Sequence, residues 1–188
     1  MSNTSANGIF TFPLALSPSE KLSLYCSFHD NIRNPNELFK QMYNAAETSL
    51  ALLDATKIVS INQLLTAANL AATRKIEIPS AWDLVHFVAP SNHAGHILRD
   101  FSFSEPAIVA ANVIVVWIAR SGNEEEYCDM LETYRIHTST KSIDSFLAKQ
   151  AETNQEKFIN LYKLTNKEVT LSSLEAAVIT RIATKMHV

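Results

Sequence analysis

Apolar residues form two different kinds of strand-like pattern along this chain. Residues 21–28 alternate between apolar and polar side chains, whereas residues 112–118 are apolar in both alternating sets. The first pattern predicts a half-buried strand, and the second predicts a strand covered on both faces. The short apolar run at residues 50–54 predicts a third strand. Residues 81–88, also apolar in both sets, are interpreted as a fourth strand, on which His86 is either a core histidine or a functional group.

Capping residues mark the starts of three predicted helices. Asn34 precedes Pro35, while Ser60 stands three residues before Gln63 and Ser172 three residues before Glu175. Ser and Gln or Glu at this spacing can form a capping box, and proline is favoured at the first helical position. Further helices are predicted from spacing over residues 93–101, 127–134, 142–150 and 155–162.

These elements predict an α/β fold class. We expect a single domain over residues 21–188, with a central mixed β-sheet of about four strands flanked by helices. Residues 1–20 are small, polar and interrupted by proline, and we expect this N-terminal segment to be partly flexible.

The C-terminal helix has an unusually wide apolar face. At 100° per residue, its apolar positions cover roughly 180°, which exceeds the stripe of a one-sided surface helix. These positions are Leu174, Val178, Ile179, Ile182, Ala183 and Met186. One flank must pack on its own domain, and the other either does the same or binds another protein, with Arg181 and Lys185 at the rim of that contact.

Composition excludes several classes of function. With 188 residues, 47% of them hydrophobic, the chain can bury a core of its own, and its net charge of −3 creates no long-range attraction to nucleic acid or anionic membranes. Three widely separated glycines leave no room for a Walker loop, a dinucleotide-binding loop or a nucleophile elbow. The apolar run at 107–119 is too short to span a membrane, and the N-terminus fits a signal peptide badly, so we expect an intracellular protein without membrane contact.

No motif for catalysis or for cofactor binding is present in the sequence. His93 and His96 have a chelating spacing but lack a clear third ligand, and Cys26 and Cys128 form no metal motif, so we expect neither metal nor cofactor. No sequence context marks a nucleophile. A stand-alone small-molecule-binding protein or enzyme stays open as an alternative, because His86, Ser91 and Asn92 lie near a predicted strand end.

Several segments resemble one protein family when they are taken in order. They are Leu161-Tyr162-Lys163-Leu164-Thr165, the stretch from Leu174 to Lys185, and residues 34–38, 63–71 and 89–92. Together they resemble the TPRKB family, the small kinase-binding subunit of the KEOPS (EKC) complex, over roughly residues 22–185. One departure is that residues 74–79 are shorter than the basic segment of many family members and include an acid, which weakens a role in holding RNA.

The resemblance implies a non-catalytic subunit that binds the atypical small kinase or ATPase of that complex and supports threonylcarbamoyladenosine modification of tRNA in the nucleus and cytoplasm. The expected kinase-binding residues, near the C-terminal helix, are Leu174, Val178, Arg181, Ile182 and Lys185. The expected tRNA-binding residues are Arg74, Lys75, Ser91 and Asn92. Alternatively, Arg74 and Lys75 only satisfy the dipole of the helix that they end.

Overall fold

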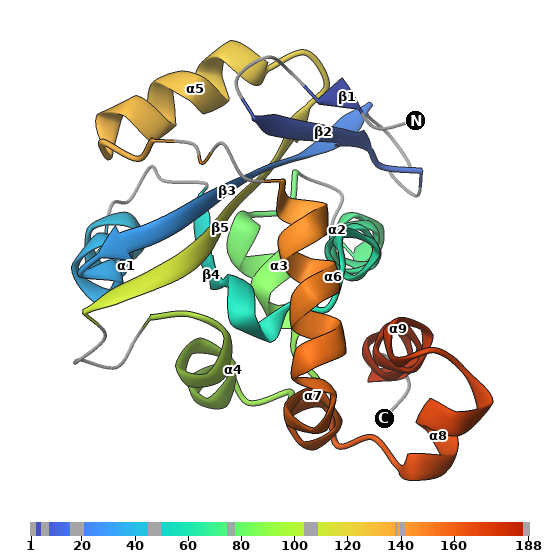
Figure 1. Ribbon diagram of the computed structural model, residues 1–188. Helices are drawn as coiled ribbons and strands as arrows, with labels where there is room; N and C mark the ends of the chain where they lie inside the picture. Colours follow the sequence, from blue (N-terminus) through green and yellow to red (C-terminus); the bar gives the residue numbers. More distant parts are fainter. Residues whose placement is uncertain are drawn as a thin grey trace.

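A five-stranded sheet forms the centre of the molecule, with strand order β1-β2-β3-β5-β4 (Figure 1). The computed structural model describes residues 3–4, 8–15, 21–44, 50–74, 78–103, 109–137, 139 and 142–185. The strands are β1 (Asn3–Thr4), β2 (Ile9–Pro13), β3 (Leu22–Arg33), β4 (Ala51–Asp54) and β5 (Ala110–Arg120). The single-domain α/β fold is thus confirmed. The sheet is not mixed, however, because every strand pair in the described residues is antiparallel.

The two long strands lie at the centre of the sheet and are covered on both faces. Residues 22–29 of β3 and 113–119 of β5 are all buried. We had expected β3 to be half-buried, and this was wrong because its polar alternate positions, Ser23, Ser27 and His29, are hydrogen-bonded beneath helices rather than exposed. The apolar positions Leu24, Cys26 and Phe28 face the opposite side.

Strand β5 is inserted between β3 and β4. Because it pairs antiparallel with both, β3 and β4 run in the same direction although they do not touch each other. Helix α1 (Pro35–Asn44) makes the crossover connection between them. A crossover through a helix is the usual connection between strands of the same direction.

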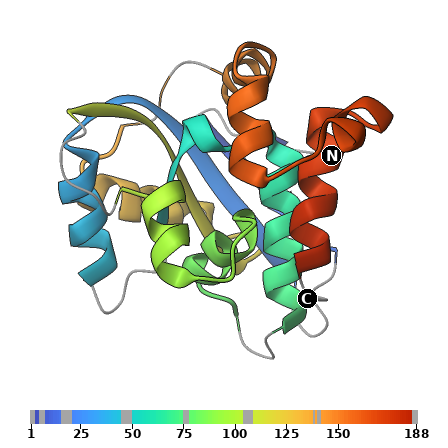
Figure 2. The ribbon, with the colours of Figure 1, turned by 90° about the horizontal axis from the view of Figure 1, so that it is seen from below.

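Helices cover both faces of the sheet (Figures 1 and 2). Helix α1 and helix α5 (Glu124–Thr133) pack on one face, where they contribute Phe39, Met42, Tyr127 and Leu131 to the core. The opposite face is covered mainly by α2 (Ile61–Arg74), α3 (Ala81–Val88), α6 (Ile143–Thr153), α7 (Gln155–Tyr162) and α9 (Leu174–Thr184). Helix α4 (Ala94–Phe101), the one-turn helix η1 (Ala55–Lys57) and α8 (Asn166–Leu171) complete the described helices.

Residues 81–88 form helix α3 rather than the predicted strand. Ser80 caps this helix, and Asp83 completes a capping box with it. Leu84, Val85 and Val88 are buried. An apolar run fits a buried helix as well as a buried strand, and the capping residues decide between the two here.

The C-terminal helices differ from prediction in their boundaries. The sequence did not predict α8, which begins with a capping box between Thr165 and Glu168. The cap of α9 is Ser173, whose hydroxyl accepts a hydrogen bond from the Ala176 amide, and not Ser172. Ser172 instead donates to the Glu168 carbonyl at the end of α8.

The N-terminal residues contribute a strand that the sequence did not predict. Strand β2 pairs with β3 from Ile9↔Ser27 to Pro13↔Ser23, and Ile9 is buried. Proline at the end of a strand is compatible with this pairing. Among the described residues, no helix is long and apolar enough to cross a membrane.

Candidate partner-binding surfaces

Helices α2 and α9 lie side by side and run in the same direction (Figure 2). Near their N-termini, the Asn62 side-chain amide donates to the Glu175 carboxylate at 2.9 Å. Near their C-termini, Arg74 is close enough to Lys185 to affect its pKa. This helix pair therefore has an acid at its starting end and cations at its finishing end, which suits both helix dipoles.

The structure places most of the predicted kinase-binding residues inside the molecule. Val178 and Ile182 have no exposed surface and belong to the core beneath α9. Lys185 is also buried, while Leu174 and Arg181 are partly exposed. Of the two alternatives for this flank, packing on its own domain therefore holds for Val178 and Ile182, which can influence a partner only through the position of α9. Kinase contact by the five residues stays a prediction.

An ion pair attaches α8 to the side of α9. The Arg181 guanidinium donates to the Glu168 carboxylate at 2.7 Å. The pKa of Glu168 is lowered, first by hydrogen bonds from the Thr165 amide and hydroxyl and then by the charge of Arg181. Leu171, which ends α8, is 76% exposed. Besides polar and small residues, the accessible surface of this region includes Leu171 and parts of Leu174 and Arg181.

Lys185 fastens the end of α9 to the end of α3. Its ammonium group donates to the main-chain carbonyls of His86 and Ala89, at 2.5 and 3.2 Å. Carbonyls at a helix C-terminus carry partial negative charge and attract a cation. Burial, and secondarily the charge of Arg74, lowers the Lys185 pKa to about 8.

A cationic cluster lies at this end of the helix pair, formed by the charged groups of Arg74 and Lys185 with the His86 imidazole beside them. The Arg74 guanidinium carbon is 5.2 Å from the centre of the Phe87 ring, a cation-π contact. His86 is half-buried on α3, and burial and then the charges of Lys185 and Arg74 lower its pKa. The structure thus brings together one predicted RNA-binding residue and one predicted kinase-binding residue.

The other predicted RNA-binding residues are less closely connected to this cluster. Ser91 and Asn92 follow the end of α3, and the Ser91 hydroxyl accepts a hydrogen bond from the His93 amide. Asn92 is exposed. Between these two residues and Arg74 the described structure contains no hydrogen bond. Lys75 lies outside the described residues.

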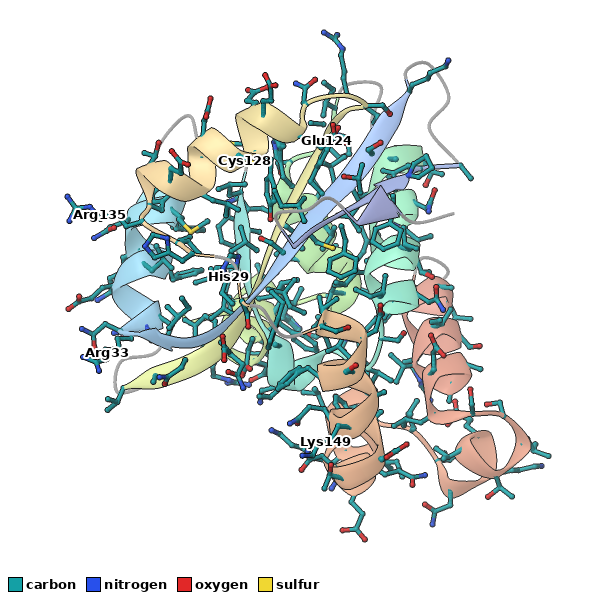
Figure 3. All side chains as sticks on the ribbon, turned by 45° about the horizontal axis from the view of Figure 1, so that its top comes forward. His29, Arg33, Glu124, Cys128, Arg135 and Lys149 are labelled. Carbon is teal, nitrogen blue, oxygen red and sulfur yellow. The ribbon has the colours of Figure 1, made fainter. Side chains whose placement is uncertain are left out.

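A buried Ser-His pair resembles a catalytic dyad in geometry alone. The Ser27 hydroxyl and His29 Nε2 are 2.7 Å apart, while His29 Nδ1 is 2.7 Å from the His137 carbonyl. His29 is labelled in Figure 3. Both side chains have 0% exposure, and the Ser27 hydroxyl also hydrogen-bonds that of Tyr127. Burial lowers the His29 pKa to about 4. A substrate cannot reach this pair, which instead connects β3 to α5 and to the segment that follows α5.

A metal centre does not form among the described residues. His93 and His96 have ring centres 5.4 Å apart, but no group of three or more potential metal ligands is found in the described part of the chain.

A groove of about 740 Å³ lies at the starting end of the α2–α9 pair. It is bordered by β2, α6 and the N-termini of α2 and α9. Its wall on α6 includes Asp144, Leu147, Ala148, Ala151 and Glu152. Sequence reasoning missed these residues, although their three- and four-residue spacing places them on one face of α6, which continues beyond the predicted end at residue 150.

Comparison with known families gave one match. The profile of a family described as kinase binding protein CGI-121 matches residues 29–186. A search of curated proteins found no match. The family match includes α2, the cationic cluster and every element from α3 to α9.

Proposed function

Because the chain belongs to the CGI-121 family of kinase-binding proteins, we propose that it is the non-catalytic kinase-binding subunit of a KEOPS complex. The observation that carries this proposal is the extent of the family match, which reaches from the end of β3 to the end of α9. A kinase-binding role also agrees with the inaccessibility of the Ser27-His29 pair, since both side chains are buried.

The proposal assigns the protein a supporting role in threonylcarbamoyladenosine modification of tRNA. In this role it binds the kinase-like ATPase, while another subunit carries out the transfer chemistry. We assign its action to the nucleus and the cytoplasm, where that complex would modify tRNA. It requires no cofactor of its own.

A contribution to tRNA binding is favoured by the cationic cluster. Arg74 is exposed at the end of α2, next to Lys185 and His86, so a phosphate group there would meet a local positive potential despite the net charge of −3. Few cations are available, so we expect binding by this subunit alone to be weak. An unpaired RNA end is a better target than a duplex, because its bases can stack or hydrogen-bond outside a helix.

Co-purification with the kinase tests the proposed function directly. The full chain, tagged and expressed with the small kinase-like ATPase subunit from the same organism, should form a complex that survives gel filtration and should change the ATPase rate of that subunit. The isolated chain should not hydrolyse nucleotides. Failure to form the complex, or robust turnover by the isolated chain after removal of contaminants, would contradict the proposal.

A further inference from the structure

We propose that the groove at the starting end of the α2–α9 pair is where a basic segment of the kinase subunit docks, with one apolar side chain of that segment inserted between α6 and α9. This inference rests on the proposed kinase-binding function and identifies the surface and the chemistry of the partner. Neither α2 nor α6 was among the predicted kinase-binding elements.

The floor of the groove suits an apolar anchor. Leu147 and Ala151 on α6, Phe12 on β2 and Leu174 on α9 line it. Ala148 also lines the groove and is exposed. Small side chains on α6 leave a hollow there, and the volume of about 740 Å³ can hold one or two large side chains of a partner. Apolar anchors that fill pockets commonly dominate the binding energy of protein interfaces.

The rim of the groove has one sign of charge. Asp144, Glu152 and Glu175 all line it, and none of the described residues that line it is basic. Within the described structure, Asp144 and Glu152 make neither a hydrogen bond nor an ion pair, and Glu175 has only the uncharged amide of Asn62. Glu152 is in the last turn of α6, where its own helix dipole disfavours a carboxylate. A lysine or arginine beside the apolar anchor would supply the missing charge.

The same charges exclude RNA as the occupant. Three carboxylates repel a phosphate backbone, whereas the charged groups of the cationic cluster, Arg74 and Lys185, lie at the other end of α2. Helix α2 has 14 residues, so its ends are roughly 20 Å apart. The α2–α9 pair thus separates an acidic surface for protein from a basic surface for nucleic acid.

Two independent changes test this surface. Asp144→Lys with Glu152→Lys reverses the rim, and Ala148→Trp fills the hollow from an exposed position. The matched control is Glu125→Lys with Glu132→Lys, which makes the same change in net charge on α5, across the sheet, at two exposed residues (Figure 1). Affinity for the purified kinase subunit would be measured at two salt concentrations, with the melting temperature of each variant.

Both groove variants should weaken kinase binding at least tenfold. The charge reversal should also remove most of the salt dependence of this binding. The kinase affinity of the control should stay within about twofold of the wild type. If the wild type binds and folded groove variants bind equally well, the groove proposal is wrong while the proposed function stands. If the wild type does not bind the kinase, both fail. If the groove variants lose tRNA affinity in the assembled complex but keep full kinase affinity, the occupant is RNA and the inference is overturned.

Discussion

The side-chain amide of Gln63 donates to the hydroxyl of Tyr162 at 2.5 Å, joining α2 to α7 across 99 residues of sequence. Both side chains are fully buried. The same Gln63 amide nitrogen donates to the Val88 carbonyl, its oxygen accepts from the Val59 amide, and the Tyr162 hydroxyl donates to the Lys57 carbonyl. These two side chains therefore satisfy three main-chain groups from two segments, residues 57–59 and the end of α3, in the middle of the apolar layer.

Tyr162→Phe should lower the free energy of unfolding by about 1 to 3 kcal/mol, because it leaves the Lys57 carbonyl and one Gln63 N–H group buried without a partner. Burial also raises the pKa of Tyr162, so no ionisation of this phenol should accompany folding at neutral pH. Chemical denaturation of both proteins measures the difference. Tyr43→Phe is the matched control, since Tyr43 is 51% exposed and should change stability by less than about 0.5 kcal/mol. Equal losses in the two variants would contradict the assigned role.

Ile182→Ala should destabilise the isolated chain by about 2 to 5 kcal/mol, since it opens a cavity in a closely packed core. Ile182 has no exposed surface, so its effect should appear without any kinase present. Leu171→Ala removes a similar side chain from a site that is 76% exposed and should change stability by less than about 0.5 kcal/mol. Thermal melts of the two variants make the comparison. A stable Ile182→Ala protein with impaired kinase binding would restore Ile182 as a contact residue.

Stability should decrease between about pH 6.5 and pH 4, partly because His29 is buried as the neutral imidazole. Its pKa is lowered from 6.5 to about 4 by burial. The unfolded state therefore binds more protons in this window, and stability falls as the pH falls. The His29 share of the loss is about 3 kcal/mol when complete. Denaturation at several pH values measures it.

Carboxylates also titrate near the lower end of this window. The useful quantity is therefore the slope of the unfolding free energy against pH between pH 7 and pH 5. It should become shallower in His29→Gln but not in His96→Gln, because His96 is exposed on α4. If His29→Gln keeps the slope of the wild type, His29 is not the group responsible.

Arg74→Glu with Lys75→Glu should weaken tRNA binding by the assembled complex and reduce its modification rate. Removing two phosphate contacts should also reduce the magnitude of the salt slope by roughly 1.4 to 1.8. The control is Lys149→Glu with Lys157→Glu at two exposed positions near α6 and α7; Lys149 is labelled in Figure 3. Kinase affinity should be unchanged in both. Unchanged tRNA affinity and modification would instead leave Arg74 with its contact to the Phe87 ring and its favourable charge at the end of the α2 dipole.

The elements with clear local signals were predictable from the sequence. Helix α2 begins after Ser60 as expected, and the main-chain amide of Gln63 donates to the Ser60 hydroxyl. The second half of the expected capping box does not form, because the Gln63 side chain bonds the Val59 amide instead. A buried glutamine has more partners to satisfy than its own helix end, and a local pattern cannot show them.

Two other errors came from ambiguous local signals. Ser80 and Asp83 carry the same capping spacing as Thr165 and Glu168, and both pairs start helices that the sequence analysis did not assign. Adjacent serines at 172 and 173 offered two possible caps, and the end of α8 uses the first.

The direction of the strands and the exposure of α9 could not be derived from one sequence. Both depend on which segments meet: β5 separates β3 from β4, and α9 packs against α2 and α7, with Val178 in the core. The wide apolar arc of α9 predicted two buried flanks, but only Ala177, Val178 and Ile182 are buried, while Leu174, Ile179 and Ala183 are partly exposed. The groove was missed for the same reason, since its walls come from four separate segments.

The insertion of β5 between β3 and β4 has a consequence during synthesis. Ser23 in β3 hydrogen-bonds Ser121, which follows β5 in the chain 98 residues later. At ribosomal rates of about 5 to 20 residues per second, β3 is made roughly 5 to 20 seconds before the strand that completes it. During that interval, both β3 and β4 lack the neighbour that joins them, and their apolar faces have no finished sheet on which to pack. The first half of the nascent chain therefore exposes apolar strand surface for longest, and the sheet closes only after residue 120 has emerged.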